Sequence, residues 1–280
     1  MNTVLITGSQ GFLGRAISQK LKSLDVNLML TGRRPQDNIY QCDLMSRTEF
    51  SALVNYCKPD LIINCAAFVP QSLADYNNKS SSLDSLMMVR NILAASSCPV
   101  LHISSMTVYG QATSADSVYK ESDAGGPTSE YGLSKWESEL LLKSDPRPTL
   151  SVRIPGLYGI SKKSGLVYNT LSACKNSKSP TLPKEPVLWS AMHVDDASSL
   201  VSKLAVNHFL EYPSINCGYP GKMNVNIFLD IIANMFNLKS GDSPVQHPTF
   251  EFDLTLVKSL NLVPNRSFES SLIDFAKEIP

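Results

Sequence analysis

Three features of the sequence predict an α/β protein built on a doubly wound parallel sheet. A short apolar run at the N-terminus leads into glycines spaced three apart, and a helical pattern follows directly. Runs typical of buried strands then alternate with helical runs five times. Such alternation is typical of strands joined by crossover helices, which form a parallel sheet. We expect a Rossmann-type domain over residues 1–159, with a returning segment at 187–206, and a smaller C-terminal substrate-binding lobe over 160–280.

Composition is typical of a globular protein and excludes several functions. With 280 residues, 43% of them hydrophobic and 18% charged, the chain can bury a full core. Its net charge of zero gives no indication of a nucleic-acid or membrane partner. No apolar run approaches the roughly 18 residues of a membrane span, and no basic leader precedes the first strand, so we expect a cytoplasmic protein. The six cysteines are scattered, which favours reduced core residues and no metal site.

The N-terminal stretch predicts where a dinucleotide binds. Val4 to Ile6 reads as a buried strand, because β-branched side chains pack well on a pleated surface. Gly8 permits a tight turn, Gly11 lets a ligand approach the backbone, and Gly14 lets the following helix press on the strand. The helix N-terminus offers free N–H groups to a pyrophosphate. The cofactor contacts expected in this loop are Gly8, Gly11, Phe12, Leu13 and Gly14.

The end of the second strand bears on which cofactor binds. Residues 25–30 form the predicted strand, and Thr31-Gly32-Arg33-Arg34 follow it. An acidic residue at this place holds the ribose 2′-hydroxyl of NAD, whereas arginine suits the 2′-phosphate of NADP. Because no carboxylate ends this strand and two arginines follow it, we expect NADP rather than NAD. The alternative is that Arg33 and Arg34 are a solvated surface pair.

The next elements continue the alternation. Residues 40–44 form a short strand, 59–67 a buried strand, 86–95 a helix and 100–105 another strand. Residues 70–83 are polar and rich in serine, which predicts a mobile loop or an irregular helix start. Ligands of doubly wound sheets bind outside the carboxyl ends of the strands, and the motifs found so far lie at such ends.

Tyr131 and Lys135 are the candidate acid/base pair. They are four residues apart, so a helix places both on one face. A phenol with an ordinary pKa of about 10 exchanges protons poorly at neutral pH, and a nearby ammonium favours the phenolate. Ser105, at the end of a predicted strand, can hydrogen-bond a substrate carbonyl. A tyrosine and a lysine at this spacing are common by chance, so the prediction depends on the motifs around them.

Taken together, these motifs resemble those of the extended short-chain dehydrogenase/reductase family of nucleotide-sugar epimerases, dehydratases and ketoreductases. The matching runs are Gly8-x-x-Gly11-x-x-Gly14, Asn64-Cys65-Ala66-Ala67, Ser104-Ser105-Met106-Thr107-Val108-Tyr109-Gly110, Tyr131-Gly132-Leu133-Ser134-Lys135 and Arg153-Ile154-Pro155-Gly156-Leu157-Tyr158-Gly159. The resemblance implies that Ser105, Tyr131 and Lys135 are catalytic, and that Tyr131 and Lys135 also contact the cofactor.

Further cofactor contacts are implied by the same resemblance. Ala66 and Ala67 would lie along the ribose and phosphate, and Pro155 beside the nicotinamide. Asp43, followed by Leu44, would lie beside the adenine ring. Asp43 could equally be the N-cap of the helix that starts near Ser46. The pair Asp195 and Asp196 is expected to cap a helix rather than to act as an acid/base pair.

The chain also departs from the family pattern. Met106-Thr107 stand where dehydratases carry Asp-Glu, which disfavours 4,6-dehydration, and Ser85 replaces the family's helix asparagine. The residues before His193 lack the arginine that grips a nucleotide diphosphate. Several lysines of the expected lobe could hold phosphates instead, or could simply be solvated. They are Lys162, Lys163, Lys175, Lys178 and Lys184.

The sequence therefore predicts an NADP-dependent reductase of a carbonyl-bearing sugar, in particular a nucleotide-linked 4-keto sugar, with Tyr131 as proton donor. One alternative is a nucleotide-sugar epimerase that retains NAD. Another is a non-catalytic, cofactor-sensing or subunit-regulating member of the same fold. The resemblance further implies a homodimer formed through the helices around 86–97 and 131–143.

Overall fold

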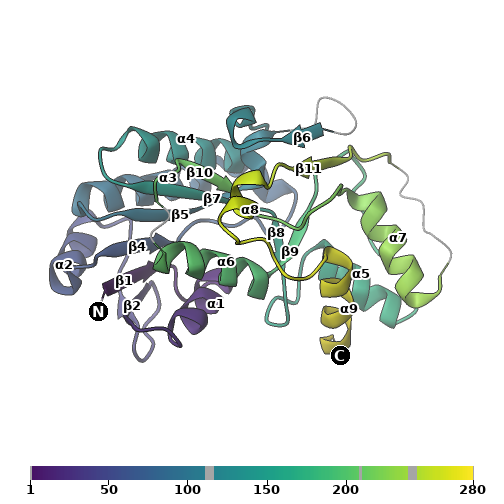
Figure 1. Cartoon of the computed structure of the whole chain (residues 1–280), viewed down its shortest axis with the longest axis horizontal. Helices are drawn as coiled ribbons and strands as arrows, with labels where there is room; N and C mark the ends of the chain where they lie inside the picture. Colours follow the sequence, from purple (N-terminus) through teal and green to yellow (C-terminus); the bar gives the residue numbers. More distant parts are fainter. Residues whose placement is uncertain (1, 111–116, 208–209, 239–244, 280) are drawn as a thin grey trace.

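The centre of the molecule is a seven-stranded parallel sheet, seen in a computed structural model that describes residues 2–110, 117–207, 210–238 and 245–279. Its strand order is β10-β7-β5-β4-β1-β2-β3 (Figure 1). The strands are β1 (Asn2–Thr7), β2 (Val26–Gly32), β3 (Tyr40–Gln41), β4 (Leu61–Asn64), β5 (Val100–Ser105), β7 (Thr149–Ile154) and β10 (Ser214–Asn216). The predicted doubly wound Rossmann-type sheet is confirmed.

Helices cover both faces of the sheet. On one face lie α1 (Phe12–Leu21) and α6 (Val194–Val206); on the other lie α2 (Arg47–Cys57), α3 (Lys79–Ala95) and α4 (Glu130–Ser144). Neighbouring residues of a strand point to opposite faces, so Leu5 packs in the α2–α3 core and Ile6 in the α1–α6 core. Because both faces are covered, the residues of the central strands β1, β4, β5 and β7 are mostly buried.

Two segments differ from the expectation. The serine-rich stretch 70–83 contains a short 3-10 helix (Ala74–Asn77), and α3 begins at Lys79 rather than at residue 86. The helix starts early because the Asn78 side chain accepts the N–H of Ser81, a capping bond that hydrophobic periodicity does not reveal. The strand expected at 40–44 is only two residues long.

The N-cap interpretation of Asp43 is wrong. Ser46 caps α2, with its Oγ accepting from the N–H of Glu49 at 3.3 Å. Asp43 closes the preceding turn instead, since its Oδ1 accepts from the N–H of Met45 at 3.0 Å. Its carboxylate therefore lies one turn before the helix, at the carboxyl edge of the sheet.

The start of α6 also differs in detail from the expectation. His193 is the N-cap, and its Nδ1 accepts from the N–H of Asp195 at 3.2 Å. Asp195 and Asp196 follow in the first turn, where carboxylates are favoured by the helix dipole. Asp196 forms an ion pair with Arg266 at 2.7 Å and accepts a hydrogen bond from Tyr219. These contacts are structural rather than acid/base.

The remaining elements gather at the C-terminal side of the sheet. They are β8 (Gly156–Tyr158) paired with β9 (Ala191–His193), β6 (Ser117–Tyr119) paired with β11 (Phe250–Phe252), the 3-10 helices Met106–Tyr109 and Glu121–Asp123, α5 (Leu166–Lys175), α7 (Val225–Phe236), α8 (Thr255–Ser259) and α9 (Phe268–Glu278). β10 does not belong to this group. It falls in the range expected for the lobe, 160–280, yet it pairs with β7 in the main sheet.

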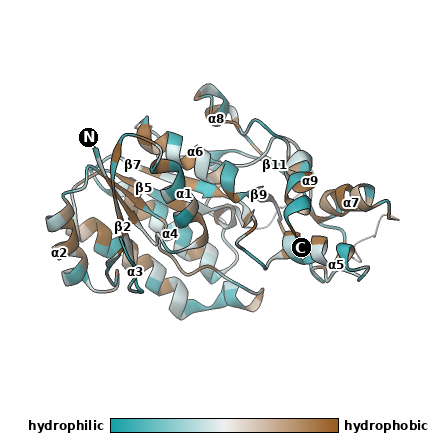
Figure 2. Ribbon diagram, turned by 90° about the horizontal axis from the view of Figure 1, so that it is seen from below, coloured by the Kyte–Doolittle hydropathy of each residue, from teal (hydrophilic) through white to brown (hydrophobic). Residues whose placement is uncertain are grey.

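The core of the sheet continues into the C-terminal region. Tyr158 packs against Phe275 of α9 with ring centroids 5.3 Å apart, and Trp189 packs against Phe228 of α7 at 5.0 Å. These side chains belong to the same hydrophobic cluster as Ile6 and Ile17. Helix α7 is largely brown in Figure 2, as expected for a helix that packs on several sides.

Candidate active site

A single cavity of about 1580 Å³ runs along the carboxyl edge of the sheet and brings all the predicted site residues together. Sites for one small molecule usually measure about 300–1,000 Å³, so this cavity has room for a dinucleotide and a second ligand. The predicted residues that line it are Gly8, Gly11, Phe12, Leu13, Gly14, Arg33, Arg34, Asp43, Leu44, Ala66, Ala67, Ser105, Tyr131, Lys135 and Pro155.

The glycine loop forms a cradle that only glycine permits. Gly8 has φ +63°, and a Cβ there would lie 2.7 Å from the backbone nitrogen of Ala66. A Cβ at Gly14 would lie 2.3 Å from the carbonyl oxygen of Gly8, so the helix packs directly on the turn. No side chain caps the N-terminus of α1, which begins after Gly11. The loop therefore fits a dinucleotide pyrophosphate, bound by the free N–H groups of the helix.

Gln10 connects this loop to the arginines at the end of β2. Its Nε2 donates to the carbonyl oxygen of Arg34 at 2.9 Å, and the N–H of Arg34 donates to its Oε1 at 3.2 Å. A Cβ at Gly32 would lie 2.3 Å from Gln10 Oε1, so the amide lies across that glycine. The side chains of Arg33 and Arg34 are exposed at the cavity, and neither forms an ion pair with any described residue.

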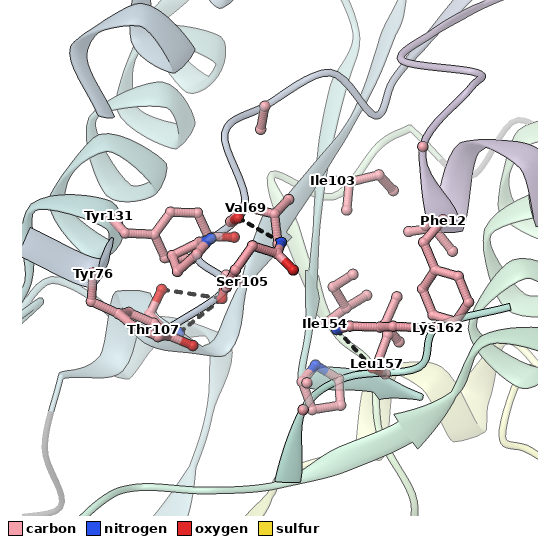
Figure 3. A pocket seen from close by; sticks show the side chains of 18 of the residues that line it. Phe12, Val69, Tyr76, Ile103, Ser105, Thr107, Tyr131, Ile154, Leu157 and Lys162 are labelled. Atoms are coloured by element: carbon pink, nitrogen blue, oxygen red, sulfur yellow. Dashed lines mark hydrogen bonds between the residues drawn. The ribbon is translucent and has the colours of Figure 1, made fainter. Parts of the chain in front are cut away.

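The catalytic candidates come from two elements. β5 ends at Ser105, and α4 carries Tyr131 and Lys135 one turn apart; each of the three is at most 8% exposed. The Ser105 side chain lies beside the phenol of Tyr131 and favours its ionised form. Ser105 Oγ also accepts from Thr107, from its N–H at 3.3 Å and from its Oγ1 at 3.1 Å. Figure 3 shows Ser105 between Tyr131 and Thr107 on one side of the cavity.

Burial controls the protonation of this pair. It raises the pKa of Tyr131, Tyr76 adds to the effect, and Ser105 opposes it. Burial also lowers the pKa of Lys135 to about 8, against the opposing effects of Cys65 and Glu139. The lysine was expected to lower the pKa of Tyr131, but the pKa is raised, because burial outweighs every other effect. Tyr131 therefore holds its proton at neutral pH.

Lys135 is positioned by the backbone of β5. Its Nζ donates to the carbonyl oxygen of Ile103 at 2.8 Å and lies 5.9 Å from the centroid of the Tyr131 ring. Tyr76 packs edge-on with the same ring, with centroids 5.7 Å apart. The phenol is thus close both to an ammonium group and to a second aromatic ring.

A buried polar network anchors α4 behind the site. Ser104 donates to Glu139, and Arg153 Nη2 pairs with Glu139 Oε2 at 2.6 Å. Arg153 Nη1 also donates to the hydroxyl of Tyr109 at 2.9 Å. Glu139 follows Lys135 by one turn, so the network holds the face of α4 that carries Lys135 against β5 and β7.

Ser85 lies outside the cavity, and several residues that line the cavity were not predicted. Ser85 Oγ accepts from the N–H of Phe68 at 2.9 Å. Sequence reasoning missed Gln10, Tyr76 and Thr107 as site residues. Thr107 had a detectable signal, since it lies two residues after Ser105, but the contact of Tyr76 with Tyr131 has no counterpart in a sequence motif.

Among the residues that the structure describes, no cluster of three or more His, Cys, Asp and Glu side chains could hold a metal ion. None of the described helices is both long enough and apolar enough to cross a bilayer.

The fold and this site define a nicotinamide-dinucleotide enzyme of the extended short-chain dehydrogenase/reductase type. The model of the RmlD substrate binding domain family matches residues 1–182, and the chain belongs to that family. The prediction of an NAD(P)-dependent enzyme of the reductase/epimerase type is confirmed at the level of the family.

Curated relatives with two different functions are similar to the chain. Methionine adenosyltransferase 2 subunit beta of Mus musculus is 26% identical over 290 residues, covering 96% of this chain and 85% of the relative. A dTDP-4-dehydrorhamnose reductase of Sinorhizobium fredii (strain NBRC 101917 / NGR234) is 28% identical over 149 residues, covering 52% of this chain and 47% of the relative.

Among solved structures, the UDP-N-acetylglucosamine 4-epimerase from Bacillus cereus has a TM-score of 0.81 and 18% identity, and the match covers 100% of this chain and 99% of the epimerase. The Thermus thermophilus UDP-glucose 4-epimerase in complex with NAD has a TM-score of 0.79 and 15% identity, covering 99% and 98%. At these identities the likeness shows the fold.

Proposed function

We propose that the chain is an NADP-dependent reductase of a carbonyl-bearing sugar, with a nucleotide-linked 4-keto sugar as the substrate class. The observation that carries this proposal is the burial of Tyr131 beside Ser105 and Lys135 in the cavity that the glycine loop also lines. A phenol that holds its proton is suited to give it to an alkoxide, which is the proton transfer that carbonyl reduction requires.

Each residue has a distinct role in this reaction. When bound, the reduced cofactor supplies a hydride for the carbonyl carbon. Tyr131 donates its proton to the developing alkoxide oxygen. Ser105 accepts two hydrogen bonds from Thr107, so it has its own proton to turn from the Tyr131 phenol to the substrate oxygen. Lys135 then stabilises the phenolate charge until solvent returns the proton.

The proposal of NADP rests on the end of β2. Two guanidinium groups without an ion-pair partner among the described residues lie at the cavity, on a turn that Gln10 fastens to the glycine loop. Arginine binds a phosphate through several N–H donors, and the NADP 2′-phosphate would satisfy Arg33 and Arg34.

The substrate class is supported by the lining of the cavity and by one relative. We propose that residues 1–159 with 187–206 bind the cofactor and that 160–280, apart from β10, bind the sugar. Residues of this second region, among them Leu166, Asn169 and Leu182, line the cavity together with the catalytic residues. A curated relative is named a dTDP-4-dehydrorhamnose reductase, which is consistent with a nucleotide-linked keto sugar.

The proposal is tested by titrating the purified protein with NADPH and NADH while following nicotinamide fluorescence. Loss of NADPH absorbance is then measured with nucleotide-linked 4-keto sugars and with the same sugars lacking the nucleotide. We expect NADPH to bind more tightly than NADH, and we expect NADPH to be oxidised only in the presence of the nucleotide-linked sugars. A preference for NADH, or cofactor that remains bound through purification, would favour an epimerase and refute this proposal.

A second candidate function is favoured by the names of several relatives. Methionine adenosyltransferase 2 subunit beta is named as a subunit of another enzyme, and its mouse form aligns along most of this chain. The corresponding proposal is a cofactor-sensing subunit that uses the same dinucleotide cavity without turnover. It predicts normal NADPH binding in the wild-type protein and no activity on any keto sugar.

A further inference from the structure

Lys162 lies in the turn after β8, and its side chain folds back into the cavity. Its Nζ donates to the carbonyl oxygen of Leu157 at 3.1 Å and lies 5.8 Å from the centroid of the Phe12 ring. Figure 3 shows Lys162 beside Phe12 and Leu157, across the cavity from Tyr131. Because Phe12 is the first residue of α1, the ammonium lies close to the helix end that the pyrophosphate cradle uses.

The charge of Lys162 has no counter-ion within the described part of the protein. The side chain is half-buried, and burial alone lowers its pKa, with no carboxylate acting in the opposite direction. None of the ion pairs among the described residues includes it. An ammonium withdrawn from water without an anionic partner is unfavourable, and one backbone carbonyl satisfies only one of its three N–H groups.

The other lysines of the same region differ from Lys162. None of them lines the cavity, and each is exposed, so each is well solvated. Lys175 is in addition bonded to the carbonyl oxygen of Ile279. The group comprises Lys163, Lys175, Lys178 and Lys184.

We propose that Lys162 binds the diphosphate of a nucleotide ligand in this cavity. Its ammonium would complement the free N–H groups of α1, whereas Arg33 and Arg34 would hold a phosphate at the other end of the glycine loop. This assignment rests on the proposed function, which places both a dinucleotide and a nucleotide-linked sugar here. Both ligands contain a diphosphate ester, and the experiment separates them.

The test compares Lys162→Gln, Lys162→Arg and the exposed control Lys163→Gln by calorimetric titration. Glutamine can still donate to the Leu157 carbonyl but has no charge, and arginine keeps the charge. The probes are ADP-ribose, NADH and NADPH for the cofactor diphosphate, and UDP and dTDP added to NADPH-loaded protein for the substrate diphosphate. We expect Lys162→Gln to lose about tenfold in affinity, Lys162→Arg to retain most of it, and Lys163→Gln to match the wild type.

The pattern across the probes identifies the diphosphate. Equal weakening of ADP-ribose, NADH and NADPH assigns Lys162 to the cofactor, because ADP-ribose and NADH lack the 2′-phosphate. Weakening of UDP and dTDP alone assigns it to the substrate. Unchanged affinities with a lowered melting temperature would overturn the proposal and leave Lys162 a structural tether of the turn, as would equal losses in the Gln and Arg variants.

Failure of the proposed function can be recognised separately. A preference for NADH, or a lack of turnover, is observed in the wild-type protein and leaves the Lys162→Gln comparison with ADP-ribose fully interpretable. Wild-type protein that binds none of these probes would refute the cavity as a nucleotide site, and the role of Lys162 with it.

Discussion

Tyr131 is a buried phenol beside Ser105, and burial keeps its proton on at neutral pH. We expect Tyr131→Phe to reduce turnover by about 10²–10⁴-fold, the usual contribution of a positioned acid. NADPH affinity should stay nearly unchanged, because the phenyl ring still fills the space beside Tyr76. Steady-state kinetics and fluorescence titration measure the two effects. Tyr76→Phe is the matched control and should retain most turnover; equal loss of turnover and cofactor binding in Tyr131→Phe would contradict the assigned role.

Gln10 acts through the backbone of Arg34, and its removal should alter cofactor choice rather than cofactor binding in general. Without the amide, the turn that carries Arg33 and Arg34 loses two hydrogen bonds to the glycine loop. We expect Gln10→Ala to weaken NADPH binding several-fold and to leave NADH binding near the wild-type value. The readout is the ratio of the two dissociation constants. A proportional loss for both cofactors would indicate a general disturbance of the loop.

The residues predicted from sequence are those whose roles depend on short spacing. Gly8, Gly11 and Gly14 follow β1 at intervals of three residues, and Tyr131 and Lys135 lie on one helical face. A local sequence pattern is therefore enough to predict both groups. Gln10 was missed, and Lys162 was named only as one of five lysines that could hold phosphates, because their contacts join segments far apart in the chain: Gln10 meets Arg34, and Lys162 meets Phe12. No local pattern encodes such contacts.

Among the elements, α4 shows how tertiary burial changes the chemistry of a residue. Burial lowers the pKa of Lys135 to about 8, whereas its ordinary value is 10.5. Between these values the unfolded chain binds a proton that the folded protein does not, so this group makes the free energy of unfolding rise with pH. Below pH 8 both states bind the proton, and the contribution no longer changes.

The effect is measured by urea unfolding of the ligand-free wild type and of Lys135→Met between pH 7 and 10. We expect the stability difference to shift in favour of the wild type above pH 8, by at most about 1.4 kcal/mol per pH unit. Comparing the two proteins cancels the titration of cysteines and tyrosines that they share. A difference that stays constant with pH would mean that Lys135 is not buried as a charged group.

The elements also divide into those that sequence patterns reveal and those that they do not. β5 was predicted with its observed bounds, and β1 and α4 were predicted at their observed places, because burial on both faces or on one helical face leaves a clear apolar pattern. The sheet of β6 and β11 was not, since each strand has three residues and the two are distant in the chain. Whether such short strands form depends on tertiary contacts rather than on a local sequence pattern.

At the scale of the whole molecule, exposed apolar side chains on neighbouring helices support the proposed homodimer. α3 and α4 pack side by side, and Leu83, Met87, Leu133 and Leu140 remain exposed on them. We expect sedimentation to give the mass of a dimer and Leu83→Glu with Leu140→Glu to give that of a monomer. Leu24→Glu, at an exposed leucine elsewhere, should remain dimeric; a monomeric wild type would refute the proposal.

The position of β10 has a consequence for how the protein emerges from the ribosome. The sheet lacks its last strand until residue 216 has been made, and α1 lacks its neighbour α6 until residue 206. A nascent chain that stops at residue 182 therefore exposes the free edge of β7 and the apolar side of α1, both of which favour aggregation. Because residues 1–182 lack the strand that pairs with β7 and the helix that covers α1, we expect productive folding to need the chain at least through β10.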